Sequence, residues 1–301
     1  ADLDLDLQEF LVDRQARNLA PKTLLWYSQT LAIFRDFLRS HNVVSAEEVT
    51  PPMLRRFLLH LKKRGHNPGG VCNVYRAVRA FLNWCEEENA PMAWANPIKR
   101  VKAPKAPQVP LEPANLAHLR KMLATCRRCG KAAKRRTLTG DRDRAIMLAL
   151  LDTGCRATEF LALDVSDVNL ATGALLVRHA KGGKFRTVFL GARSRRALVR
   201  YLRHRDPSGP LWVTVRSTRL TYSGLRQIMR RRAKRAGVPV PALHSFRRAF
   251  ALLSLRNDID LVSLQRLMGH SDLSVLRRYL AQTEDDLRRA HEKAGPVDNM
   301  L

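Results

Sequence analysis

The sequence has 301 residues, which is enough for two domains that each bury a core. Its 54 Lys and Arg residues outnumber 27 Asp and Glu residues and give a formal net charge of +27. Such a surplus repels itself in a compact chain unless a polyanion shares the surface, and nucleic acid is the polyanion that fits best.

Membrane and secretory functions are disfavoured by the same inspection. No apolar run approaches the ~20 residues that a membrane span requires. The acidic N-terminus, residues 1–6, lacks the charge pattern of a signal peptide. We therefore expect a cytoplasmic, nucleoid-associated protein without a membrane partner.

The five cysteines are odd in number and scattered, which argues against a disulfide framework. Cys126 and Cys129 form a C-x-x-C pair, but no second pair stands at zinc-finger spacing. We expect a reduced pair in a basic loop and no metal site.

Residues 1–103 are predicted to form a helical bundle, because apolar residues recur there at three- and four-residue steps. One helix covers 21–39, a second starts after Thr50 at Pro51, and a third follows Gly69-Gly70. Its exposed basic residues are candidate phosphate contacts, although they could also be merely solvated. These candidates are Lys62, Lys63, Arg76 and Arg79.

Residues 104–113 contain four prolines at three-residue spacing and are predicted to form a semi-rigid, extended linker. Lys102 and Lys105 would suit a segment that lies along a charged partner. We therefore place the domain boundary here.

Residues 114–301 are predicted to form a second, mixed domain. A basic loop at 127–136, with Arg127 and Arg128, contacts phosphates or is solvated. A buried helix follows at 141–153, and strands at 173–180 and 185–190 flank a hairpin turn at 181–184. Helices dominate from residue 194 onward. The expected fold class is mainly α with a small β-sheet (α+β).

Attack on a phosphodiester needs a positioned nucleophile, stabilisation of charge on the phosphate oxygens and a proton for the leaving alkoxide. Arginine suits the second task, because its planar fork bridges two phosphate oxygens. Residues fit for these tasks occur in a suitable order. They are Arg156, Lys181, His244, Arg247, His270 and Tyr279.

Each of these residues also has an ordinary interpretation. Arg156 and Glu159 would share a helical face, where Glu159 either holds the guanidinium from behind or forms a surface salt bridge. The His244-x-x-Arg247 pair can arise by chance, His270 can cap a helix after Gly269, and Tyr279 can lie in a core. It is the combination that favours phosphodiester chemistry.

At these residues the sequence resembles the tyrosine recombinases, the family of phage integrases and Xer-type recombinases. Residues 141–165 resemble the first arginine box, and the segment with Lys181 resembles the G-K-G-x-K-x-R hairpin. His244-x-x-Arg247 resembles the second box. Leu267-Met268-Gly269-His270, followed by Tyr279, resembles the third. The helical region 1–103 is similar to the core-binding, SAM-like domain of that family.

The resemblance implies that Tyr279 attacks a DNA phosphate and forms a 3′-phosphotyrosyl bond. Arg156, Arg247 and His270 would hold the charge of the transition state, and Lys181 would protonate the leaving 5′-oxygen. His244 would act as acid or base or bind the phosphate. No cofactor or metal is implied, and religation needs no ATP because the covalent bond stores the energy.

The implied function is site-specific recombination in integration, excision, resolution or transposition. Its partners would be duplex DNA with specific sites, further copies in a tetramer on DNA, and a related recombinase or accessory protein. The tail at 284–301 would supply contacts between protomers. Two alternatives stay open: type IB topoisomerase-like relaxation of DNA, and a catalytically idle DNA-binding protein.

Overall fold

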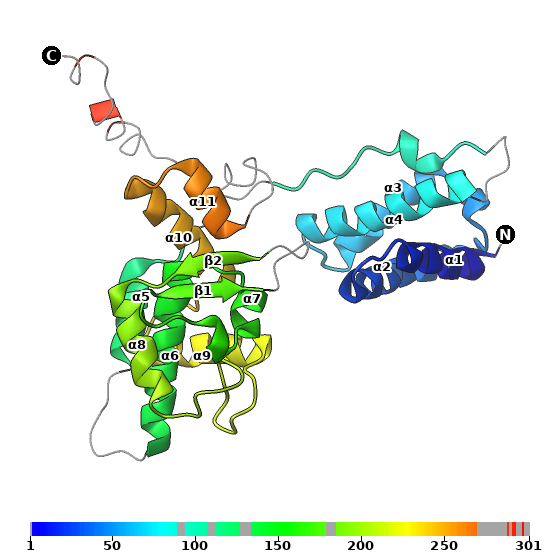
Figure 1. Ribbon diagram of the computed structural model, residues 1–301. Helices are drawn as coiled ribbons and strands as arrows, with labels where there is room; N and C mark the ends of the chain where they lie inside the picture. Colours follow the sequence, from blue (N-terminus) through cyan, green and yellow to red (C-terminus); the bar gives the residue numbers. More distant parts are fainter. Residues whose placement is uncertain are drawn as a thin grey trace. The chain divides into compact units, whose positions relative to one another are not determined.

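The computed structural model describes residues 2–88, 94–107, 112–126, 134–178 and 185–269, with residues 288, 291, 292 and 297; for 134–137 it describes the backbone alone. The chain divides into two compact units, an N-terminal unit of residues 1–109 and a C-terminal unit of residues 110–301. Each unit has its own hydrophobic core. The structure confirms the predicted fold class, which is mainly helical with one small sheet (Figure 1).

The described part of the N-terminal unit is helical. Its elements are α1 (Leu3–Ala16), α2 (Pro21–Arg39), η1 (Ala46–Glu48), α3 (Pro51–Lys63), α4 (Pro68–Glu88) and η2 (Pro97–Arg100). Aromatic side chains fill the core where α1, α2, α3 and α4 meet, with Phe10 and Phe81 in edge-to-face contact. The bundle follows from apolar stripes that each helix can bury only against its neighbours.

Local signals at the helix starts explain these bounds. Thr50 caps α3 by accepting a hydrogen bond from the amide of Met53 at 3.4 Å, as its place before Pro51 predicts. The prediction that Gly69-Gly70 precede the next helix is wrong, because α4 begins at Pro68. Asn67 accepts a hydrogen bond from the amide of Gly70 at 2.7 Å, so both glycines lie in the first turn.

The chain after α4 stays attached to the N-terminal unit as far as residue 104. The Tyr75 hydroxyl donates to the carbonyl of Val101 at 2.8 Å, and the Cys72 thiol donates to the carbonyl of Pro104 at 2.9 Å. The predicted linker at 104–113 therefore begins at a residue that still contacts α4. Residues 108–111 of that linker lie outside the described residues, and its extended character stays a prediction.

The C-terminal unit is built around one long helix. Its elements are α5 (Leu116–Ala124), α6 (Lys134–Thr153), α7 (Ala157–Ala162), η3 (Val165–Asp167), β1 (Ala174–Val177), β2 (Arg186–Phe189), α8 (Ala192–Leu202), α9 (Tyr222–Ala236), α10 (Leu243–Arg256) and α11 (Leu261–Met268). Helix α6 packs against α8 and α10, and α9 packs against α5 (Figure 1). Phe160, Trp212 and Phe246 are among the side chains of this core.

Helix α6 begins earlier than the sequence analysis predicted. The predicted basic loop at 127–136 is wrong for residues 134–136, which belong to the helix. Lysine and arginine are good helix formers, so a basic run does not break a helix. Residues 127–133, with Arg127, Arg128 and Cys129, lie outside the described residues.

The two strands pair antiparallel, as predicted. Ala174 lies opposite Phe189 and Val177 lies opposite Arg186. Both strands are shorter than the predicted ranges. β1 begins only at Ala174, because Gly173 before it has a φ of +82°, which is not an extended conformation. The predicted turn at 181–184 lies outside the described residues.

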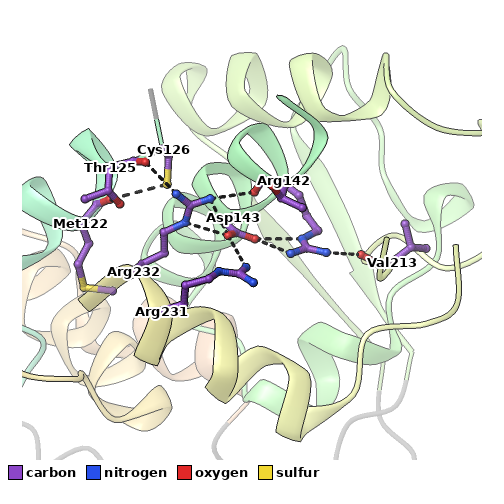
Figure 2. Close-up of polar contacts among 9 residues, drawn as sticks. Met122, Thr125, Cys126, Arg142, Asp143, Val213, Arg231 and Arg232 are labelled. Atoms are coloured by element: carbon purple, nitrogen blue, oxygen red, sulfur yellow. Dashed lines mark hydrogen bonds and ion pairs between the residues drawn. The ribbon is translucent and has the colours of Figure 1, made fainter. Parts of the chain in front are cut away.

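A buried carboxylate ties several segments of the C-terminal unit together (Figure 2). Asp143 on α6 is 0% exposed and accepts hydrogen bonds from Arg142 at 2.7 Å, Arg232 at 2.8 Å and Arg231 at 3.0 Å. Arg142 also donates to the carbonyl of Val213, and Arg232 to that of Thr125. The cluster therefore fixes α6 to α9, to the end of α5 and to the chain after α8.

We predict that Asp143→Asn lowers the free energy of unfolding by about 3–5 kcal/mol, because it leaves buried guanidinium groups without their counter-charge. Urea unfolding of the unmodified protein and of Asp143→Asn measures this loss of unfolding free energy. The matched control is Asp164→Asn, where the half-exposed pair with Arg219 is lost at a cost of at most about 1 kcal/mol. Equal losses in the two variants would contradict the anchoring role of Asp143.

Candidate active site

The structure describes four of the residues singled out around the reactive constellation: Arg156, Glu159, His244 and Arg247. Lys181, His270 and Tyr279 lie outside the described residues, and nothing is placed for them. The described four come from α7, from the residue before it, and from α10. Their geometry defines the part of the site that can be built.

Arg156 stands at the start of α7 with an extended backbone, at φ −66° and ψ 143°. Its guanidinium donates to Oε1 of Glu159 at 2.8 Å, and its amide donates to Oε2 at 3.1 Å. Arg156 precedes the helix, so the expectation that the two share a helical face is wrong. Glu159 nevertheless holds the Arg156 guanidinium, as expected, and it also accepts from the Arg156 amide at the start of the helix. Glu159 is 2% exposed, so the pair is not a surface salt bridge.

Glu159 has a second basic partner that the sequence analysis missed. Arg186 on β2 donates from Nη2 to Oε2 of Glu159 at 2.6 Å. Burial alone would raise the pKa of the Glu159 carboxyl, but the hydrogen bonds from Arg186 and Arg156 lower that pKa below its ordinary value. Glu159 therefore stays ionised at neutral pH and holds both guanidinium groups.

A signal for Arg186 was present in the sequence. Arg186 is the last basic residue of the segment that follows Lys181, and it lies two residues before Val188 in the same strand. Residues two apart share one face of a strand, and Val188 faces the core. An arginine on the inner face of a strand requires an internal acceptor, which would have directed attention to Glu159.

Arg247 is 1% exposed and binds main-chain oxygens on both sides. Its Nη1 donates to the carbonyl of Gly154 at 2.7 Å, and its Nη2 donates to the carbonyl of Met268 at 2.6 Å. These carbonyls lie two residues before Arg156 and two residues before His270. One buried guanidinium thus joins the chain segments that lead into the first and third boxes.

Gly154 can only be glycine in this arrangement. It adopts a φ of +58°, and a Cβ built there would lie 2.2 Å from Cδ1 of Phe250 on α10. Both the left-handed backbone and the close approach of the ring exclude a side chain. The turn at Gly154 ends α6 and directs the chain to Arg156.

His244 lies on α10 at the surface, one helical turn before Arg247. Partial desolvation and the guanidinium groups of Arg248, Arg247 and Arg156 lower the pKa of His244 below its ordinary value. Its imidazole is therefore neutral at pH 7 and able to accept a proton or a hydrogen bond. A neutral imidazole among several guanidinium groups suits an anionic ligand such as a phosphodiester.

The predicted phosphate contacts of the N-terminal unit are all exposed. Lys62 and Lys63 end α3, and Arg76 and Arg79 lie one turn apart on α4. Lys102 and Lys105 are exposed in the segment after η2. Their role as DNA contacts stays a prediction.

A further basic surface on α9 was missed by the sequence analysis. This α9 face carries five exposed cations and the helix contains no acidic residue; the five are Arg226, Arg230, Arg231, Lys234 and Arg235. Helix α9 also packs against α7, the helix that follows Arg156. The run of Arg and Lys at 230–235 was visible in the sequence, but its helical face could not be oriented without the fold.

The described part of the chain has no candidate membrane span and no candidate metal centre. None of its helices is long and apolar enough to cross a membrane. No group of three or more His, Cys, Asp and Glu side chains within it could hold a metal ion.

We predict that His244 titrates below the 6.5 of an ordinary histidine, which NMR of its imidazole measures. Because the unfolded chain binds this proton more readily, His244 makes folding less favourable as pH falls below about 6.5 and has no such effect above it. Arg156→Gln should raise the midpoint, whereas Arg35→Gln in the N-terminal unit should not. A midpoint at or above 6.5 in the unmodified protein would contradict the geometry.

Both units of the chain match known protein families. Residues 117–285 match the Phage integrase family, and residues 7–89 match the Phage integrase, N-terminal SAM-like domain. The chain is 30% identical over 293 residues to a tyrosine recombinase XerC of Oceanobacillus iheyensis, with 94% of this chain and 93% of the relative covered. It is 28% identical over 284 residues to a tyrosine recombinase XerA of Saccharolobus solfataricus, with 90% and 86% covered.

Solved structures share the fold. A XerH site-specific recombinase bound to palindromic difH substrate gives a TM-score of 0.71 at 23% identity, with 95% of this chain and 82% of that chain covered. A lambda integrase dimer bound to a COC′ core site gives 0.74 at 18% identity, with 91% and 97% covered. These findings confirm the resemblance drawn from the arginine boxes. The chain belongs to the phage integrase family, the enzymes known as tyrosine recombinases.

Proposed function

We propose that this enzyme recombines duplex DNA at specific sites through a 3′-phosphotyrosyl intermediate on Tyr279. The observation that carries the proposal is the convergence of Arg156, His244 and Arg247 in the C-terminal unit, where both arginines lower the pKa of His244. These three residues come from segments more than 80 positions apart in the sequence. Their gathering gives a cationic site with one neutral base.

The proposed cleavage step balances as follows. The Tyr279 oxygen attacks the phosphorus and forms a P–O bond, and its proton passes to a base for which His244 is the candidate. The P–O bond to the 5′-oxygen breaks, and Lys181 gives that oxygen a proton. Reversal of these transfers with a new 5′-hydroxyl joins the strands, because the phosphotyrosyl bond conserves the energy of the one cleaved.

Charge stabilisation is divided among residues in different settings. Arg156 is partly exposed and held from behind by Glu159, so its remaining donors can bind a phosphate oxygen. Arg247 is buried with two nitrogens on main-chain carbonyls. A guanidinium has five N–H groups, so binding a phosphate does not require Arg247 to give up these two contacts, and its charge acts on the site in either arrangement. His270 would complete the set.

Assembly on DNA is part of the proposal. A full exchange cuts four strands, so four protomers would act on two sites, and a related recombinase or accessory protein could join them. Relatives in solved structures are described as bound to difH substrate and as a dimer on a core site. The tail at 284–301, mostly outside the described residues, would contact a neighbouring protomer.

Trapping on nicked duplexes tests the chemistry. A library of nicked duplexes from genomic fragments is incubated with the unmodified enzyme and with Tyr279→Phe, then separated under denaturing conditions. We expect a covalent adduct with the unmodified enzyme alone. Binding by both proteins without any adduct would favour an idle DNA-binding protein, and relaxation of plasmids that lack a site, without recombinants, would favour a topoisomerase-like activity.

The α9 face gives a second test, directed at DNA binding. We expect Arg230→Gln and Lys234→Gln each to weaken binding to all duplexes alike and to reduce the slope of log K against log salt by roughly 0.9, the loss of one phosphate contact. Arg17→Gln, an exposed cation paired with Asp13 on α1, is the matched control. An unchanged slope in both α9 variants would remove this face from the DNA contact surface.

A further inference from the structure

We infer that Arg186 is a positioning residue for the reaction: it joins the strand after the Lys181 segment both to Arg156 and to the chain that leads into His270. The inference rests on the proposed function for its catalytic consequence. Its physical basis is a set of contacts, called here the Arg186 clamp, made by Arg186, Glu159 and the carbonyl of Leu267. No role was assigned to Arg186 from the sequence.

The clamp is buried and charged. The Arg186 side chain is 8% exposed, its Nη2 lies 2.6 Å from Oε2 of Glu159, and its Nε lies 2.9 Å from the Leu267 oxygen. A buried guanidinium keeps its charge only while its donors find acceptors. The clamp therefore fixes β2, the start of α7 and the end of α11 relative to one another.

The two oxygens of Glu159 have separate partners. Oε1 accepts from the Arg156 guanidinium, whereas Oε2 accepts from Arg186 and from the Arg156 amide. Loss of Arg186 would leave Oε2 buried with one weaker donor and would free the carboxylate to turn. Arg186 thus acts on the Arg156 guanidinium through Glu159, without touching it.

The end of α11 is held by two arginines. Arg186 donates to the carbonyl of Leu267, and Arg247 donates to the next one, Met268. The last carbonyls of a helix lack partners within the helix and carry its negative pole, so cations stabilise them. Arg186 and Arg247 therefore set the point from which the chain leaves toward His270.

Gly269 shows how closely Arg186 approaches this point. It adopts a φ of +62°, and a Cβ built there would lie 2.9 Å from Nη1 of Arg186. That Nη1 is buried and has no hydrogen-bond partner among the described residues. The guanidinium therefore lies close to the backbone turn at Gly269, directly before His270 in the sequence.

Lysine cannot reproduce this geometry. Its ammonium is a single point, whereas the arginine fork reaches a carboxylate and a carbonyl from two nitrogens with fixed separation. We expect Arg186→Lys to keep one contact and to restore only part of the function lost in Arg186→Gln. Adduct formation should be fastest in the unmodified enzyme, slower in Arg186→Lys and slowest in Arg186→Gln.

The test compares Arg186→Gln with Arg178→Gln. Arg178 follows β1, and like Arg186 it binds a buried carboxylate, that of Asp167, but it contacts none of the site residues that the structure describes. At saturating nicked duplex, we expect Arg186→Gln to form the adduct roughly 10- to 100-fold more slowly, as for partners that orient ligands from outside a site. The dissociation constant for DNA should stay within about 2-fold, and Arg178→Gln should keep the unmodified rate, because the Arg186 clamp reaches Arg156 and α11 whereas the described contact of Arg178 with Asp167 does not.

A double-mutant cycle separates positioning from a general loss of stability. If Arg186 acts through Glu159, Arg186→Gln in the Glu159→Gln background should slow adduct formation much less than in the unmodified background. Equal slowing in both backgrounds would overturn the action of Arg186 through Glu159. So would equal slowing by Arg186→Gln and Arg178→Gln.

Hydrogen exchange tests the clamp without reference to activity. Peptides covering 156–163 and 261–269 should exchange faster in Arg186→Gln and unchanged in Arg178→Gln. If the unmodified enzyme forms no adduct, the proposed function fails, yet this exchange pattern would still support the clamp. Unchanged exchange in both peptides would overturn the clamp even where the unmodified enzyme forms adducts normally.

Discussion

The buried carboxylate of Glu159 is the interaction on which the described part of the site depends. It lies between two guanidinium groups that belong to different segments of the chain, Arg156 before α7 and Arg186 on β2. Without an anion between them, two guanidinium groups that are largely removed from water would repel each other strongly. The same anion also caps α7, so the local fold and the placement of Arg156 have one cause.

This arrangement is part of a wider use of acidic residues. The chain has half as many acids as bases, and several of these acids are buried in the described part of the chain. They are Asp6, Asp141, Asp143, Glu159 and Asp167. Asp143, Glu159 and Asp167 neutralise arginines that support the fold. Acids placed inside leave the surface more positive than the composition alone would make it. That distribution favours a polyanionic partner at little cost to the interior.

The helical periods predicted much of the fold. Pro21–Arg39 and Pro51–Lys63 have the predicted starts, because proline and a capping threonine act locally. The start of α4 was misplaced because two glycines were taken as a break, although Asn67 caps the helix across them. The strand pair was predicted from two segments that flank a glycine-containing turn, while the start of β1 depends on the turn at Gly173.

The site could be predicted only in part for a related reason. Spacing along the chain singled out Arg156, Glu159 and the His244–Arg247 pair, because the members of each pair lie only three residues apart and form a local motif. It marked Arg186 as facing the core from a strand but could not connect it to its partners Glu159 and Leu267, which are 27 and 81 positions away. Nor could it show that Arg247 is buried on two carbonyls. Contacts of this kind arise from tertiary packing, which periodicity does not encode.

Arg231 belongs both to the α9 face and to the buried Asp143 cluster, which limits how the enzyme can change over evolutionary time. Arg231 belongs to the α9 face and is 44% exposed, yet it also binds the fully buried Asp143. The other four cations of that face make no ion pair with the described residues. If the face contacts DNA phosphates, those four positions can be substituted without disturbing the interior, while Arg231 is held constant by Asp143. Changes in the affinity for DNA would then arise around one fixed residue, and libraries built to vary that affinity should leave it unchanged.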